Sequence, residues 1–177
     1  FGMEHGNEKF RREVVKRNYS NKLAIELMKI PSDLDIPFSV NNIIGFPGET
    51  RELAFDTIEL NRHFASDDTS CSILVPFHGT EIRRVAEEKG YISKDSIFTI
   101  SNTSEESVLD MPQWPKEDIV KLRNTFAMYV KFPKSRWPEI KKAEDDPDTF
   151  KKLSDEFIDT YWSNRDMDVK EAAKGLI

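Results

Sequence analysis

The chain has 177 residues, of which 38% are hydrophobic and 33% are charged, and its net charge is −6. These values describe a soluble globular chain of one domain or a domain with an appendage, and they argue against a nucleic-acid binder, which needs a basic face. No apolar run approaches the ~20 residues of a membrane span, so we expect no membrane partner, and the single cysteine, Cys71, is compatible with the cytoplasm.

The N-terminal stretch is predicted to contain the end of a strand and then two helices. Residues 1–6 resemble a strand whose beginning is missing, which predicts a fragment of a longer protein. Helical periodicity starts at Asn7, and Ser20 is a candidate cap for the second helix, which Pro31 is expected to end. The predicted buried stripe of that helix consists of three aliphatic residues, Leu23, Leu27 and Ile30.

A strand, a glycine turn and a helix are predicted twice in the next part of the chain. The first strand, 38–44, runs into the turn Gly45–Thr50, and a helix to about Ala65 follows. The second strand, Cys71–Pro76, is followed by a turn with Gly79, a Thr80 cap and a helix that Gly90 closes. Repeated units of this kind predict an α/β fold with parallel strands, whose C-terminal ends bind ligands.

The remaining residues, 101–177, are predicted to form a long loop or lid at 101–115 and a helical extension. We therefore divide the chain into 1–100 and 101–177. A last short helix is predicted to start at Asp166 or Asp168. The apolar stripes of the two main helices are Ile119, Leu122, Phe126 and Tyr129 in the first, and Phe150, Leu153, Phe157 and Tyr161 in the second.

A few polar residues are candidates for chemistry or for structure. Glu4, at the mouth of the first strand, either accepts hydrogen bonds from a ligand or is a solvated turn residue. Asn41 or Asn42 must face the interior of the sheet, where it needs a partner or contacts a ligand. For Glu49, just ahead of a helix, we favour a structural role. The three histidines lack metal-ligand spacing, and Cys71 is expected in the core.

Three stretches together resemble the second half of a radical S-adenosylmethionine (radical SAM) domain. They are Phe1–Glu8, Asn42–Thr50 and Val75–Ile82, which resemble the fourth, fifth and sixth strands of that barrel with the turns after them. Their order and spacing are more specific than each motif alone, and the resemblance covers about residues 1–90. The likeness is strongest to the class with a cobalamin-binding domain ahead of the radical domain.

The resemblance implies a partial parallel (β/α) barrel that holds S-adenosylmethionine across the C-terminal ends of its strands. In it, Glu4 corresponds to a position that meets the methionine or ribose portion, and Ile43 and Gly45 flank the adenine. Asn41 is a further candidate for a ligand contact. The backbone after the sixth strand borders the same base, and it corresponds to Pro76, Phe77 and His78.

The implied cofactors are S-adenosylmethionine, a [4Fe–4S] cluster and, in this class, cobalamin. The sequence departs from the family because it lacks the Cys-x3-Cys-x2-Cys loop and any Asp-x-His-x2-Gly signature. We expect those ligands upstream of Phe1, and we expect this chain alone to be inactive. His5 stands where a serine is common, which puts a ribose hydrogen bond at that position in doubt.

The chain is therefore predicted to be strands four to six of a radical SAM barrel, followed by an α-helical extension. The whole enzyme would act on a small molecule or another substrate through 5′-deoxyadenosyl-radical chemistry, such as methyl transfer or ring formation. Two alternatives remain: a phosphate-binding α/β barrel with anion sites at Gly45–Thr50 and Gly79-Thr80, and a non-catalytic interaction module. We also expect self-association through the exposed sheet edge beside Glu4.

Overall fold

The computed structural model describes residues 1–98 and 106–162. The chain forms two compact units, Phe1–Lys131 and Phe132–Ile177. Among the described residues, no helix has both the length and the apolar character that a membrane span requires. The predicted helix at Asp166 or Asp168 and the first part of the 101–115 loop lie outside the described ranges.

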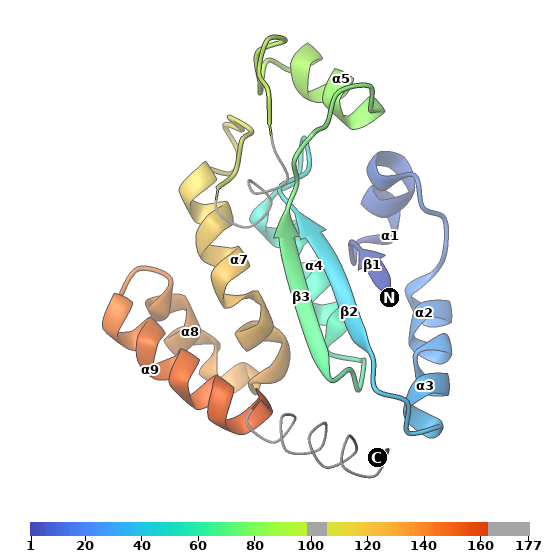
Figure 1. Ribbon diagram of the computed structural model, residues 1–177, viewed down its shortest axis with the longest axis vertical. Helices are drawn as coiled ribbons and strands as arrows, with labels where there is room; N and C mark the ends of the chain where they lie inside the picture. The colour runs from blue at the N-terminus through green and yellow to red at the C-terminus, as the bar shows by residue number, and fades with distance from the viewer. Residues whose placement is uncertain (99–105, 163–177) are drawn as a thin grey trace, which may run out of the picture. The chain divides into compact units, whose positions relative to one another are not determined.

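The first unit is built on a parallel sheet of three strands in the order β1-β2-β3 (Figure 1). The strands are β1 (Gly2–Glu4), β2 (Ser39–Ile44) and β3 (Asp68–Ile73). β2 and β3 pair in continuous register from Ser39↔Asp68 to Ile44↔Ile73, whereas the pairing of β1 with β2 shifts between Gly2 and Glu4. The predicted α/β architecture with parallel strands is confirmed.

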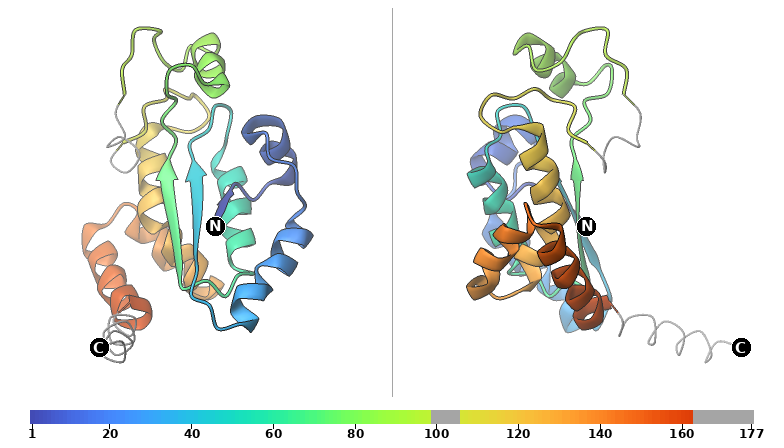
Figure 2. Two further views of the ribbon diagram at one scale, coloured as in Figure 1. Left: turned by 45° about the vertical axis from the view of Figure 1, so that its right-hand side comes forward. Right: turned by 90° about the vertical axis from the view of Figure 1, so that its left-hand side faces the viewer.

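Two helices, α4 (Arg51–Asn61) and α7 (Lys116–Lys131), lie on the same side of this sheet (Figure 2). Residues on the helix side of the strands are buried, namely Val40, Asn42 and Ile44 on β2 and Thr69, Cys71 and Ile73 on β3. The alternate residues form what we call the open face: Ser39, Asn41, Ile43, Asp68, Ser70 and Ser72. Parallel sheets usually have both faces covered and both faces apolar, so this polar face is unusual.

The third strand begins three residues earlier than predicted and ends at Ile73, before the predicted end at Pro76. The polar residues 66–69 were predicted to end the preceding helix, with the strand starting only at Cys71. In the structure Asp68–Ser70 pair with β2, and Ser70 lies on the open face, where a polar side chain needs no apolar partner. The paired part of β3 therefore includes polar residues before Cys71 and leaves out the end of the apolar run that predicted the strand.

The helices after β1 depart from the prediction in two ways. They are α1 (Glu8–Phe10), η1 (Arg11–Val15), α2 (Asn21–Leu27) and α3 (Lys29–Asp33). Ser20 caps α2 as predicted, and Asn7, where helical periodicity was predicted to start, caps α1. Pro31 does not end the helical segment, because it lies in the first turn of α3, where its missing N–H is not needed. The predicted stripe is wrong as a buried face: Leu23, Leu27 and Ile30 are 45%, 47% and 54% exposed.

The residues of α2 and α3 that do pack inward are smaller or more flexible than the predicted aliphatic stripe. Ala24 and Met28 join the core cluster of Met3 and Val40, and Pro31 is also buried. Because Ala24 and Met28 occupy the core side of the helix, the more hydrophobic stripe lies on another face. Hydrophobicity alone therefore predicted the wrong face.

The other predicted helices of the first unit are confirmed. Thr50 caps α4, and Thr80 caps α5 (Glu81–Glu88) by accepting a hydrogen bond from the Arg83 amide. Gly90 follows α5 with a φ of +71°, the left-handed conformation of a helix C-terminal glycine. The stripe of α7 that was predicted from Ile119 onward is buried.

The second unit consists of η2 (Lys134–Arg136), α8 (Trp137–Ala143), α9 (Pro147–Phe157) and η3 (Ile158–Trp162). Its core includes Ile140 and Leu153, and the ring of Phe132 packs edge-on against Phe157 at 5.8 Å. The Arg136 guanidinium donates hydrogen bonds to the carboxylates of Glu139 and Glu156.

A pair of buried amides joins β2 to α4. The Asn42 Nδ2 group donates to Asn61 Oδ1 at 3.1 Å, and Asn61 Nδ2 donates back to Asn42 Oδ1 at 2.9 Å. Asn42 Nδ2 also reaches the Ser70 carbonyl, and Asn61 Nδ2 reaches the Thr57 carbonyl. Every polar atom of the two amides thus has a partner, which is the condition for burying them.

We predict that Asn42→Ala and Asn61→Ala each lower the free energy of unfolding by about 1–3 kcal/mol, because each leaves the other amide buried without its partner. The double variant should lose less than the sum, since no orphaned amide remains. Urea unfolding measures both effects, with the exposed Asn41→Ala as the control. Strictly additive losses would show that the two amides do not act as a pair.

A second prediction concerns acid stability in the second unit. Hydrogen bonds from Arg136 lower the pKa of Glu139 and of Glu156. The stabilisation is therefore complete above the unfolded pKa of these carboxyls, and it disappears as the pH falls through their lowered folded pKa. We expect Arg136→Gln to cost about 0.2–1 kcal/mol at neutral pH and progressively less as the pH falls through the lowered folded pKa of the two carboxyls.

Amide hydrogen exchange in α9, followed from neutral pH into acid, measures this effect within the second unit. The wild-type chain serves as the reference at each pH. If the variant and the wild type differed equally in amide protection at all pH values, the two carboxylates would not contribute to stability through Arg136.

Candidate functional site

The turn after β2 is held by the side chain of Glu49. Gly45 has a φ of +83°, and its amide donates to Glu49 Oε2 at 2.7 Å. The Phe46 amide donates to the same oxygen at 2.9 Å, and the Glu49 side chain is fully buried. The structure confirms the structural role favoured for Glu49. Its carboxylate, however, accepts from the amides of the loop after β2 and not from those in the first turn of α4.

The other oxygen of Glu49 contacts a histidine at the end of β1. His5 Nε2 lies 3.1 Å from Glu49 Oε1, and both side chains are inaccessible to solvent. The Asn7 amide donates to His5 Nδ1, so the ring proton is on Nε2 and is donated to Glu49. The ring of Phe10 stacks on the imidazole at a centroid distance of 4.5 Å. The ends of two neighbouring strands are thereby connected.

The buried side chain of Arg11 contacts the backbone of the same histidine. Arg11 Nη1 donates to the His5 carbonyl at 2.7 Å and to Asn21 Oδ1 at 2.9 Å. Its guanidinium also lies 3.9 Å from the centroid of the Tyr19 ring. Burial lowers the pKa of Arg11 from its usual high value. These contacts fix the loop between η1 and α2 against the end of β1.

Gly6 allows α4 to approach the end of β1 closely. A Cβ atom at this position would lie 2.1 Å from the Asp56 carbonyl oxygen and 2.5 Å from the Thr57 Cα. The Gly6 amide donates to Thr57 Oγ1 at 2.8 Å. Only glycine therefore fits between the strand end and the helix.

The segment 106–115 packs as part of the core of the first unit. Leu109, Met111 and Trp114 are buried, and Gln113 Nε2 donates to the Glu49 carbonyl at 3.0 Å. This part of the predicted loop or lid has neither helix nor strand, yet its side chains fix it beside the turn after β2.

Three of the predicted site residues lie on or beside the open face. Asn41 and Ile43 are on the open face of β2, and Asn41 Oδ1 accepts a hydrogen bond from Ser70 Oγ at 2.8 Å. Glu4 has a φ of +62°, and its carboxylate lies 3.1 Å from Arg17 Nη2. It would lie 2.7 Å from a Cβ on Gly2, which pairs with Asn41, so the carboxylate is near the same face.

Gly45 is at the end of this face, but its amide is already bonded to Glu49. The group after β3 lies apart, because the chain leaves the sheet there and runs to α5 (Figure 1). Pro76 is buried, Phe77 is 44% exposed and His78 is exposed. The predicted residues therefore form two groups, the open-face group and the group between β3 and α5.

A second buried arginine fixes the segment after β3. Arg83 of α5 donates to the Pro76 carbonyl at 3.4 Å and to the Ser96 carbonyl at 2.9 Å, and Nε donates to Glu87 Oε1. The Phe77 carbonyl accepts from Thr80 Oγ1 at 2.7 Å. The Pro76 and Phe77 carbonyls belong to the backbone that the resemblance places beside the adenine. Both thus already accept a hydrogen bond within the protein.

The described residues offer no group of three or more histidine, cysteine, aspartate or glutamate side chains that could hold a metal ion. Cys71 is buried, as expected, and burial raises the pKa of its thiol well above the usual value. A [4Fe–4S] cluster therefore finds no set of ligands among these residues.

Sequence reasoning did not find the contact between His5 and Glu49, or the buried roles of Arg11 and Arg83. The first pair is separated by 44 residues, so no local spacing indicates it. For His5 and Glu49, the one usable signal was that each lies directly beside a glycine in the turn at the end of a predicted parallel strand. Two such turns on adjacent strands must lie close together.

We predict that Glu49→Gln lowers the free energy of unfolding by about 1–3 kcal/mol, although glutamine has nearly the same shape as glutamate. Glu49 accepts from three N–H groups, and the amide of glutamine must present N–H to at least one of them. Urea unfolding beside the exposed control Glu88→Gln, expected within about 0.5 kcal/mol of wild type, measures the effect. Equal stability of Glu49→Gln and wild type would show that the carboxylate does not hold the turn.

A scan against models of known protein families finds no match, and no curated protein matches the sequence.

Proposed function

We propose that the first unit is the C-terminal half of a radical SAM domain and that its open face binds the adenosine side of S-adenosylmethionine. The observation that supports this most is a polar face of the parallel sheet that no described helix or strand of the first unit covers, with helices on the other side of the sheet (Figure 2). A sheet of this kind has no reason to present polar side chains on one face unless that face meets solvent or a ligand.

The residues of the open face suit a nucleoside. Ser70 and Ser72 are small, Gly2 has no side chain, and Ile43 gives an apolar contact for a base. Because Asn41 Oδ1 accepts from Ser70, the Asn41 amino group points away from that serine and can donate to a ligand. The Glu4 carboxylate beside Gly2 can accept from a ribose hydroxyl or an amine.

The turn geometry argues against the phosphate-binding alternative. An anion site at Gly45–Thr50 needs free backbone amides, but the Gly45 and Phe46 amides both donate to Glu49. A phosphate at that place would also meet the buried Glu49 carboxylate. The first turn of α5 contains Glu81, which likewise repels an anion at Gly79-Thr80.

In the proposed enzyme, this chain binds and orients S-adenosylmethionine and excludes water on one side of it. A [4Fe–4S] cluster, held by cysteines of another segment, would supply the electron that cleaves the cofactor, and a cobalamin domain belongs to the same proposal. The radical reaction is a part of the proposal that follows from the resemblance alone, and the proposed cytoplasmic location is argued from the single cysteine, Cys71. This chain by itself is proposed to be inactive.

The proposal predicts weak but localised binding of S-adenosylmethionine to the isolated chain. We expect amide chemical shifts at Glu4, Asn41 and Ile43 to move in an NMR titration at millimolar cofactor. Asn41→Ala should weaken binding roughly tenfold, since it removes one donor to a polar ligand. Asn124→Ala, an exposed asparagine on α7, is the matched control and should bind as the wild type does.

Inorganic phosphate, titrated in the same way, tests the alternative. Shifts confined to the turns at Gly45–Thr50 or Gly79-Thr80 with phosphate, and none on the open face with S-adenosylmethionine, would overturn the proposal. Equal effects of Asn41→Ala and Asn124→Ala would remove Asn41 from the site.

A further inference from the structure

A cleft of about 490 Å³ lies between η1, the turn after β2 and α5, and we call it the helix-side cleft. Its volume is within the range of roughly 300–1,000 Å³ that small-molecule pockets have. Its walls are mostly apolar, and they consist of Phe10, Val14, Val15, Pro47, Ile82 and Val85. All of these side chains except Pro47 are only partly buried, so the two walls face each other without closing the space between them. A small molecule in the cleft would remove this apolar surface from water.

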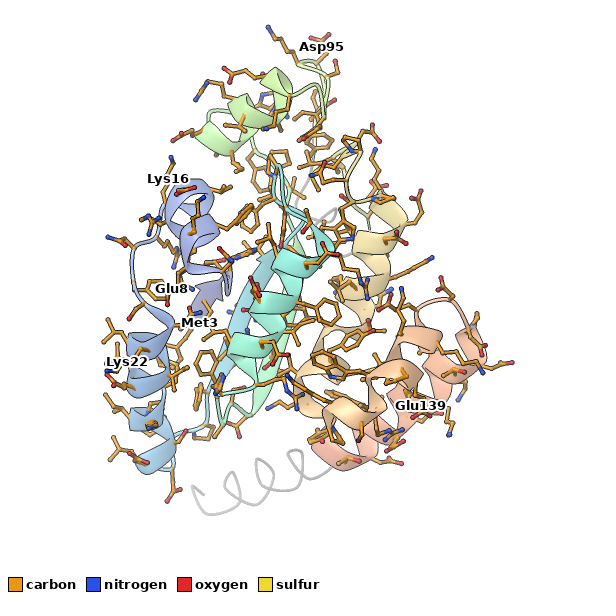
Figure 3. All side chains as sticks on the ribbon, turned by 180° about the vertical axis from the view of Figure 1, so that it is seen from behind. Met3, Glu8, Lys16, Lys22, Asp95 and Glu139 are labelled. Carbon is orange, nitrogen blue, oxygen red and sulfur yellow. The ribbon has the colours of Figure 1, made fainter. Side chains whose placement is uncertain are left out.

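The helix-side cleft is separate from the open face. Pro47 and Gly48 belong to the turn after β2, so the cleft lies at the C-terminal end of the sheet, and a Cβ atom on Gly48 would meet no atom within 4 Å. Figure 3 views the molecule from the side of the sheet that α4 covers, and there Lys16 at the end of η1 lies beside α5. The open face is on the other side of the sheet (Figure 2). A ligand in this cleft therefore does not occupy the surface proposed for S-adenosylmethionine.

The wall on the η1 side is fixed by the core of the first unit. The Phe10 ring stacks on His5 at 4.5 Å and meets the ring of Phe46 edge-on at 6.1 Å, and His5 is held by Glu49. η1 is a π-helical turn, and Lys16 after it has a φ of +61°; such turns are rare and are frequent at functional sites. The wall is thus formed in advance, and a ligand does not have to order it.

The wall on the α5 side combines an apolar row with a terminal cation. Ile82, Val85 and Lys89 follow one another at intervals of three and four residues, so they share one face of the helix. Glu81 and Lys89 both line the cleft, and the eight residues between these positions span about 12 Å along a helix. The cleft therefore follows α5, and an extended apolar chain suits it better than a compact body does.

The cleft is lined by two lysines and two glutamates, and three of these four charges already have a partner. Lys16 Nζ lies 3.6 Å from Glu81 Oε1, in a pair that connects η1 to α5. The carboxylate of Glu13 lies 3.3 Å from Arg12 Nη2. A cationic ligand would have to compete for both carboxylates.

Lys89 is the lining charge that is left. Among the residues that the structure describes, its ammonium makes no ion pair, and its one recorded contact is the Tyr91 ring, with the centroid at 5.9 Å. The two glutamates that precede Lys89 pair with arginines of the same helix. A carboxylate head group would gain a partner at Lys89, whereas a dianion such as phosphate would be repelled by the glutamates of the cleft.

We infer that the helix-side cleft binds a small carboxylate with an extended apolar body. The chain lies along Ile82 and Val85, and the carboxylate pairs with Lys89. This site goes beyond the proposed function, because it is on the other side of the sheet and includes none of the residues proposed to contact S-adenosylmethionine.

The test titrates the 177-residue chain with octanoate, octanol and octylamine, which have the same chain length and differ in the charge of the head group. With octanoate, NMR should show shifts of the amides of Val14, Gly48 and Val85 that saturate at millimolar ligand. Octanoate should bind roughly fivefold tighter than protonated octylamine, because only the carboxylate gains an ion pair at Lys89.

Variants of the cleft provide the second arm. Lys89→Gln should weaken octanoate binding roughly threefold and leave octanol binding unchanged, and Lys89→Glu should make octylamine the tighter ligand. Lys22→Gln, which changes an exposed lysine on α2, is the matched control. Val85→Phe places a larger side chain in the cleft and should abolish binding of all three probes. Because neither Lys89 nor Val85 is buried, these variants should unfold at nearly the wild-type urea concentration.

Four results would overturn the inference. They are octylamine binding as tightly as octanoate, equal effects of Lys89→Gln and Lys22→Gln, no saturable shifts with octanoate, and shifts centred on the exposed leucines of α2, which would mean that octanoate binds any exposed apolar surface. S-adenosylmethionine titrated into Val85→Phe should bind as it does to the wild type. Loss of cofactor binding in that variant would overturn the separation of the cleft from the open face.

Discussion

The hydrogen bonds to the buried carboxylate of Glu49 are the interaction on which the C-terminal end of this sheet depends. A charge in the interior is tolerated only when its oxygens are fully hydrogen-bonded, and here two backbone amides and one imidazole N–H meet that need. The same three bonds fix the turn after β2 and connect it to the end of β1. Gln113 adds the segment 106–115 to this arrangement through the Glu49 carbonyl.

The consequence for chemistry is that His5 and Glu49, the two residues that would attract attention as an acid–base pair, are fully used for structure. Each imidazole nitrogen has a partner within the protein, one as donor and one as acceptor. No position on this pair is left for a substrate, and neither side chain reaches solvent. In the function that we propose, the first unit therefore contributes hydrogen-bonding groups and shape through the open face.

Much of the fold could be predicted from the sequence, because strands, glycine turns and capping threonines are local features. Thr50, Thr80 and Gly90 have the predicted roles, and the parallel sheet follows from their repetition. The buried face of α2 could not be predicted, since the residues that pack on Met3 and Val40 are Ala24 and Met28 and not the more hydrophobic stripe. Likewise Asn41 and Asn42 look equivalent in sequence, and only the pairing with Asn61 distinguishes the buried one. The proposed function rests on the resemblance, and the open face is the structural feature from which we argue it.

The two-residue alternation along β2 and β3 separates stability from recognition within the same strands. Val40, Asn42 and Ile44 hold the helices, while Ser39, Asn41 and Ile43 point away from them. A mutation on the open face leaves the packed side untouched, so descendants of this protein can change the chemistry of that face without first acquiring extra stability. The scaffold is in that sense evolvable, and its core residues should diverge more slowly than the neighbours that alternate with them.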